Sequence, residues 1–220
     1  MGEDRKQINR LYFYLSCCRN WTEGAIMQGN RVLSLQALLA MLPASPEAAF
    51  AMMDAQRLAM KHRNAEDHFF VIAVDRVFSW LKTNPNCGMQ LSSQFLAGAS
   101  QFEGQFPKRK LTRSTPNKPP LEQAAPEAIR DMREHEIEYL GFGKGPGKYQ
   151  PSYMQPVNEG TREMIADASS VIVTNDGYLI GGWLNVQIAI EALTKLLPTI
   201  EKEIRDCEKA LSALGPPSGK

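Results

Sequence analysis

Apolar residues recur at intervals of three and four positions over most of this chain, the spacing that predicts amphipathic α-helices. The predicted helices cover residues 6–20, 31–42, 45–63, 65–83, 121–140 and 183–214. Ser45 can cap the third of them, and Pro46 suits its first turn. Pro198 predicts a kink in the last helix. Residues 86–106 are ambiguous, because Gly and Ser break weak helical signals there.

One stretch has the composition of β-strands. In "SSVIVTNDGYLIGG", residues 169–182, two runs of β-branched and aromatic residues flank Asn175, Asp176 and Gly177, a combination typical of a hairpin turn. The same stretch ends in two glycines before Trp183, which could admit a small molecule, although a tight turn is the simpler interpretation. The predicted fold class is therefore all-α, a bundle of about five helices with a small β-hairpin before the C-terminal helix.

Two segments show no apolar period and are predicted to be loops. One, near 103–120, is rich in Pro and Lys, and the other, near 141–160, is rich in Gly and Pro. No G-K-[ST] follows the glycines of the second segment, so it is not a P-loop. We interpret residues 1–220 as a single helical domain that carries both loops.

The first loop holds a cluster of basic residues. An exposed, solvated loop is the simpler interpretation of this cluster, and an arm that contacts nucleic-acid phosphates is the functional one. The residues concerned are Lys108, Arg109, Lys110 and Arg113.

Composition narrows the class of protein. A formal net charge of +1 argues against a globally basic nucleic-acid binder. The four cysteines form no C-x-x-C pair, as expected for free thiols in an intracellular protein. No apolar run is long enough to cross a bilayer, and the N-terminal run is too short for a signal peptide. We therefore expect a cytoplasmic protein with no membrane partner.

The chain contains three histidines, and two of them follow an arginine by five positions. Arg63 precedes His68 in "RNAEDH", and Arg130 precedes His135 in "RDMREH". On a helix, positions four apart share a face, so His135 would lie between Asp131 and Tyr139. Arg130 and Glu134 are likewise spaced for an ordinary ion pair on a different face.

Other kinds of site find little support. The chain has no E-x-x-H pair and no G-x-S-x-G elbow, so we expect no metal, no cofactor and no nucleophilic triad. A histidine between Met132 and Tyr139 on an apolar helix face is also, in general, more often a packed core residue than a catalyst. This second interpretation stays open beside the functional one.

The two R-x4-H stretches resemble the signature of the HEPN superfamily, in which an arginine, a polar residue and a histidine follow one another on a helix. Asp131 and Asn64 are the polar residues here, and the "EIEYL" that follows His135 is similar to the ending seen in bacterial members. The resemblance implies a small helical bundle. It also implies either a metal-independent endoribonuclease, active as a homodimer with the motifs facing each other, or a binding module of toxin–antitoxin, phage-defence or RNA-processing systems.

Carried over to this sequence, the resemblance assigns roles to individual residues. His135 would be the general base or acid at the RNA 2′-hydroxyl or leaving oxygen, Arg130 would neutralise the scissile phosphate, and Asp131 would orient the imidazole. Tyr139 supports the same face. A secondary motif comprises Arg63, Asn64 and His68. The implied partners are RNA, a second copy of the chain and an antitoxin-like protein, and the alternative is a non-enzymatic helical interaction protein.

Overall fold

The computed structural model describes residues 2–83, 90–111, 121–134, 155–159, 162–166 and 171–215. These residues form five helices and three small antiparallel sheets, which confirms the predicted all-α class with a hairpin before the last helix. The helices are α1 (Glu3–Ala40), α2 (Pro46–Lys82), α3 (Ser93–Gly104), α4 (Ala125–Glu134) and α6 (Val186–Ala213). No helix within these ranges is both long and apolar enough to cross a membrane.

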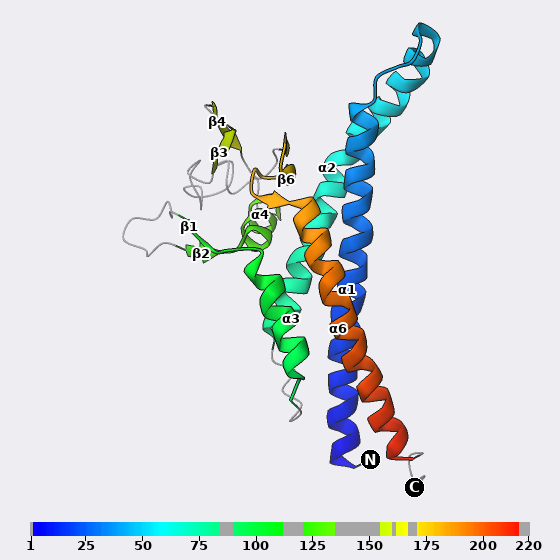
Figure 1. The fold of residues 1–220 in the computed structure, drawn as a ribbon, viewed down its shortest axis with the longest axis vertical. Helices are drawn as coiled ribbons and strands as arrows, with labels where there is room; N and C mark the ends of the chain where they lie inside the picture. The colour runs from blue at the N-terminus through cyan, green and yellow to red at the C-terminus, as the bar shows by residue number, and fades with distance from the viewer. Residues whose placement is uncertain are drawn as a thin grey trace, which may run out of the picture.

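The first two helices form a long antiparallel hairpin (Figure 1). Each joins two segments that the apolar pattern predicts as separate helices. In α1 the joining stretch buries Thr22, Gln28 and Gly29, and these small or polar residues interrupt the apolar signal without interrupting the helix. The start of α2 is as predicted, because Ser45 Oγ accepts a hydrogen bond from the Ala48 amide at 3.2 Å and Pro46 occupies the first turn.

Helix α6 packs along the hairpin and completes the core (Figure 1). At the crossing, Gly29 of α1 lies so close to α6 and α2 that an added Cβ would stand 2.7 Å from Ile190 and 2.8 Å from Phe70. Helix α6 continues through Pro198. The start of α1 lies beside the end of α6, where the Arg5 side chain donates a hydrogen bond to the carbonyl of Gly215.

Helix α3 lies in the region where the sequence is ambiguous. Ser92 caps it by accepting from the Phe95 amide at 3.1 Å, and a row of phenylalanines then fixes its position. Phe102 contacts Phe78 of α2 and Phe106, with ring centroids 5.9 and 5.2 Å apart. Aromatic burial of this kind compensates for the weak intrinsic helicity of a segment rich in Gly and Ser.

The three sheets are short. β1 (Arg109–Leu111) pairs with β2 (Leu121–Gln123), β3 (Gln155–Glu159) with β4 (Arg162–Ala166), and β5 (Val171–Thr174) with β6 (Gly177–Ile180), which also pairs with β7 (Leu184–Asn185). The β5–β6 hairpin turns at the predicted Asn-Asp-Gly, where Gly177 has φ +128°. Asn185 then caps α6, and its amide also donates to the Asp176 carbonyl at 2.7 Å.

Strands β1, β2, β3, β4 and β7 depart from the predicted elements. The sequence predicts a helix from residue 121, loops at 109–111 and 155–159, no strand at 162–166, and the last helix already at 184–185. Strands β1 to β4 form by antiparallel pairing, in which Arg109 lies opposite Gln123 and Gln155 lies opposite Ala166. The apolar periodicity of a single segment does not report such pairing. Of the first predicted loop, residues 103–104 belong to the end of α3 and 105–108 connect it to β1. Residues 112–120 and 141–154 of the two predicted loops, and the predicted helical residues 135–140, fall outside the described ranges.

The far end of the α1–α2 hairpin projects beyond α6 (Figure 1). We call residues 33–62 the arm. Within the arm only Ala59 is buried. The Gln56 amide of α2 closes it by donating to the last carbonyls of α1, with distances of 3.3 Å to Leu38 and 3.0 Å to Met41. These bonds satisfy carbonyls that a helix end otherwise leaves without a partner.

Candidate functional site: a polar seam between two helices

The described part of the second arginine–histidine stretch, residues 130–134, lies beside α2. Helix α4 packs on α2, with Arg130 next to Asp75 and with Arg133 acting on Asp67 and His68 of the first stretch. Together with one tyrosine of β6 they form a group of polar and charged side chains that we call the polar seam. Its members are Arg63, Asp67, His68 and Asp75 of α2, Arg130, Arg133 and Glu134 of α4, and Tyr178 of β6.

Asp67 is the most deeply buried member of the seam. Its residue is fully inaccessible, and the Tyr178 hydroxyl donates to its two carboxylate oxygens at 3.1 and 3.2 Å. Burial raises the pKa of Asp67 to about 6, against the opposing effects of Arg133, the tyrosine hydrogen bond and Arg63. This carboxyl group therefore titrates closer to neutrality than an exposed aspartate does.

His68 follows Asp67 and lies half-buried at the edge of the seam. Burial lowers the pKa of its imidazole, the positive charge of Arg133 lowers it further, and Glu134 acts in the opposite direction. The net effect favours the neutral ring at physiological pH. A neutral imidazole beside a guanidinium combines a proton acceptor with a fixed positive charge, the pair of groups that metal-free phosphoryl chemistry requires.

Arg130 lies on α4, about one helical turn before Arg133. Its Nε lies 3.5 Å from Oδ2 of Asp75, which is buried, and its Nη1 lies 3.1 Å from Glu134. The ion pair with Glu134 is the one that the sequence spacing predicts. The contact with Asp75 is not predicted, and it means that this guanidinium already balances two carboxylates within the protein.

The structure brings together some of the predicted site residues and places others apart. Arg63 and Asp131 are half-buried, and Asn64 is exposed on α2. Lys108 is exposed before β1, and Arg109 and Lys110 belong to that strand. The residues outside the described ranges are His135, Tyr139 and Arg113.

Four members of the seam were not identified from the sequence. They are Asp67, Asp75, Arg133 and Tyr178. A signal for the two aspartates does exist, because Asp67, Val71 and Asp75 are spaced by four and all three are buried, so the carboxylates lie on the apolar stripe of α2. Buried carboxylates need partners, and this predicts arginine or tyrosine from another element without saying which one.

Among the residues that the structure describes, no group of three or more His, Cys, Asp or Glu side chains is arranged to hold a metal ion. The carboxylates of the seam lie near guanidinium groups: Asp75 is next to Arg130, and Arg133 and Arg63 act on Asp67.

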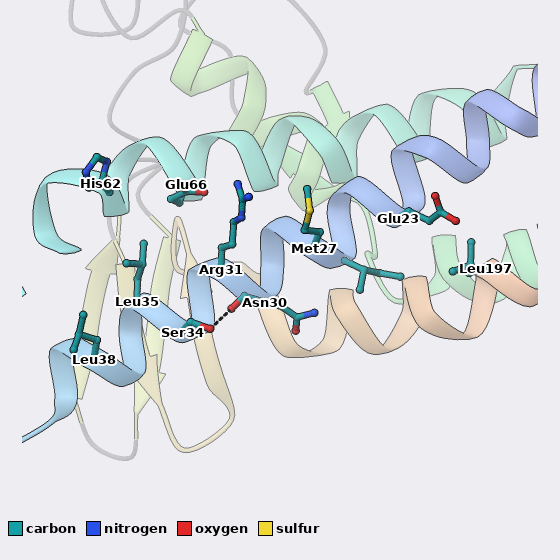
Figure 2. Close-up of a pocket in the computed structure, with 11 residues that line it drawn as sticks. Glu23, Met27, Asn30, Arg31, Ser34, Leu35, Leu38, His62, Glu66 and Leu197 are labelled. Carbon is teal, nitrogen blue, oxygen red and sulfur yellow. Dashed lines mark hydrogen bonds between the residues drawn. The ribbon is translucent and has the colours of Figure 1, made fainter. Parts of the chain in front are cut away.

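An open groove of about 1010 Å³ lies along α1 (Figure 2). Both apolar and polar side chains of α1 line it, with His62 and Glu66 of α2 on one side and Leu197 of α6 on the other. Gln28 of α1 lies beneath it and donates to the Glu66 carboxylate, which links the two helices. The sequence pattern does not indicate this groove.

Comparisons of this chain with protein-family models, with curated proteins and with solved structures found no match.

Proposed function

We propose that this chain is a HEPN-like helical domain that binds RNA and cleaves it without a metal ion, with the polar seam forming part of its site. The proposal rests on one observation beyond the sequence resemblance: Arg133, within the second R-x4-H stretch, acts electrostatically on both Asp67 and His68 of the first. Two stretches that are far apart in sequence thus supply one local environment of imidazole, guanidinium and carboxylate.

The chemistry follows from these groups. A neutral histidine accepts the proton of an RNA 2′-hydroxyl, whose oxygen attacks the adjacent phosphorus, and the 5′-oxygen leaves with a proton from a second acid. Guanidinium groups stabilise the negative charge that grows on the phosphate oxygens. His135 is the first candidate for the base and His68 the second. Arg133 acts on both His68 and Asp67, and Arg63 acts on Asp67, whereas Arg130 is occupied by Asp75 and Glu134.

The resemblance also supplies the expected setting. The domain would act in the cytoplasm as a homodimer, alone or under the control of an antitoxin-like protein. Lys108, Arg109, Lys110 and Arg113 would contact the RNA backbone outside the site, since phosphate contacts supply affinity without sequence readout.

The test uses the three histidines as matched variants. Purified wild type should cleave single-stranded RNA in excess EDTA, and His135→Ala should slow cleavage by about a hundredfold or more if that imidazole is the base. His68→Ala should weaken cleavage if the seam contributes. His62→Ala is the control, because His62 is exposed, lines the groove and lies outside the seam. Cleavage that survives both the first and the second substitution would refute the assignment.

A non-enzymatic interaction protein is the second candidate, and one observation favours it. Asp67 is sealed from solvent, and Arg130 is held by two carboxylates, as expected if the seam serves to hold α4 and the sheet against α2. In that case wild type neither cleaves nor retains RNA, and substitutions in the seam lower only the melting temperature. Retention of RNA without cleavage would indicate a binding module.

A further inference from the structure

We propose that the arm is a self-association surface, on which α2 of one copy pairs antiparallel with α2 of a second copy. This inference is independent of the proposed action on RNA. It concerns residues 46–62, the arm portion of α2, which lie beyond the reach of α6 (Figure 1).

The arm exposes several large apolar side chains. Large apolar side chains more than half exposed occur at six of its positions. They are Met41, Leu42, Phe50, Met53, Leu58 and Met60. Phe50 is 75 % exposed and Leu42 88 %. Clustered exposure of this kind marks an interaction surface, because each such side chain gains free energy when it is removed from water.

Helical geometry gathers four of these residues on one side of α2. At about 100° per residue, Phe50, Met53, Leu58 and Met60 fall within about 160° of one another around the axis. Ala59, the buried residue of the arm, lies on the opposite side against α1. The outward half of α2 therefore carries four large apolar side chains that the described part of the chain leaves uncovered.

The charged residues on this face indicate which molecule binds to it. Four charged residues lie on the same outward half, in the order acid, acid, base, base: Glu47, Asp54, Arg57 and Lys61. Asp54, Arg57 and Lys61 make no ion pair within the described residues. An antiparallel copy would set the acidic half against the basic half, whereas a parallel copy would oppose like charges.

One register satisfies the apolar and the charged residues together. With the two-fold axis between Ala55 and Gln56, Asp54 faces Arg57 of the second copy, and Met53 faces Leu58 of the second copy. Phe50 then lies opposite Lys61 of the second copy, and an ammonium group over an aromatic ring is attractive. Each contact occurs twice, because a two-fold interface is self-complementary.

The charge pattern gives a direct experiment on the full-length protein. Wild type should form a dimer that dissociates on dilution, as measured by sedimentation equilibrium. Asp54→Arg alone and Arg57→Asp alone should each raise the dissociation constant by about tenfold or more, since like charges then face each other. The double variant D54R/R57D should restore dimerisation, and an equimolar mixture of the two single variants should form the heterodimer.

Apolar substitutions supply the matched control. Phe50→Ala should weaken the dimer, whereas Phe13→Ala should not, because Phe13 is similarly exposed on α1 but lies outside the arm. The arm is remote from the core, so circular dichroism and thermal melting should show that all variants fold. A wild type that stays monomeric would overturn the proposal, and so would a dimer indifferent to positions 50, 54 and 57. Binding of monomeric wild type to lipid vesicles would point to a membrane as the occupant and would overturn it as well.

Discussion

The phenolic hydroxyl of Tyr178 donates to both carboxylate oxygens of Asp67, at 3.1 and 3.2 Å, and both residues are buried. This contact ties β6 to the middle of α2. The tyrosine backbone is itself fixed, because its amide donates to Gln187 Oε1 of α6 at 2.9 Å. A chain of polar contacts therefore runs from α6 through the hairpin to α2, and it positions the side chains around which the seam is built.

Tyr178→Phe removes the hydroxyl and leaves the ring in place. The buried carboxylate of Asp67 then loses a donor, and we expect the free energy of unfolding to fall by about 1–3 kcal/mol at neutral pH. Tyr12→Phe is the control, since Tyr12 is only partly buried against the core, and its effect should stay within about 0.5 kcal/mol. Chemical denaturation monitored by circular dichroism measures both. Equal effects of the two substitutions would argue against the contact.

Asp67→Asn isolates the pH dependence of that carboxyl group. Its pKa is raised in the folded protein to about 6 from an ordinary value of 3.8, so between these values the folded state holds a proton that the unfolded state has lost. Stability from this group is thus fully present below the lower value and is lost as pH rises through the upper one.

In D67N the side chain at position 67 has no ionisable group, and its amide oxygen can still accept the hydrogen bond from the Tyr178 hydroxyl. The unfolding free energy of wild type minus that of D67N should therefore fall by up to about 3 kcal/mol as pH rises from about 4 to about 7. Urea denaturation at several pH values gives this difference directly. A difference that grows with pH would mean that Arg63 and Arg133 outweigh burial and that Asp67 is ionised throughout.

The features of this fold that the sequence predicts are those that depend on residues close together in the chain. The cap at Ser45, the turn at Gly177 and the ion pair of Arg130 with Glu134 each depend on residues at most four positions apart, and each was predicted. The continuity of α1 was not, because Thr22 and Gln28 pack at positions where the apolar period fails. Tertiary packing decided that outcome rather than the local pattern.

The polar seam depends even more on contacts between residues that are far apart in the sequence. Both R-x4-H stretches are visible in the sequence, yet the approach of residues 130–134 to α2 depends on how α4 packs, and no periodicity encodes that. Asp67 finds its partner Tyr178 at a separation of 111 positions, in a segment that the pattern marks only as a strand. Sequence reasoning could have found the buried aspartates from their place on an apolar stripe, but not the residues that neutralise them.

Arg130→Ala tests how much stability the folded protein loses when the buried carboxylate of Asp75 has no neighbouring guanidinium. Removing the guanidinium leaves a buried carboxylate without its nearest positive charge, and we expect a loss of about 1–3 kcal/mol, since Arg130 is itself partly exposed. Arg205→Ala, which breaks an exposed pair with Glu201, should change stability by less than about 0.5 kcal/mol.

The double variant R130A/D75N completes a mutant cycle. If the buried ionised carboxylate is the source of the loss, neutralising it should recover part of the stability that R130A removes. Additive losses would show that the two side chains contribute separately. The same measurement bears on cleavage assays, because a loss of activity in R130A counts as catalytic only where the protein remains folded.

Gly29→Ala tests the crossing of α1 with α2 and α6. A methyl group there would stand 2.7 Å from Ile190 and 2.8 Å from Phe70, closer than real Cβ contacts, so two well-packed side chains must move. We expect the free energy of unfolding to fall by about 1–3 kcal/mol, the usual cost of overpacking a core. Gly24→Ala is the matched control on the same helix, because nothing lies within 4 Å of its added Cβ.

Gly24→Ala should instead stabilise the protein by up to about 1 kcal/mol, since alanine favours the helix more than glycine does. Opposite signs for the two substitutions, measured in one denaturation series, would establish that α1 is one continuous helix with α6 pressed against Gly29. Stabilisation by both would mean that α6 does not approach α1 so closely. The seam would then need another support, because the capped start of α6 holds the hairpin that presents Tyr178 to Asp67.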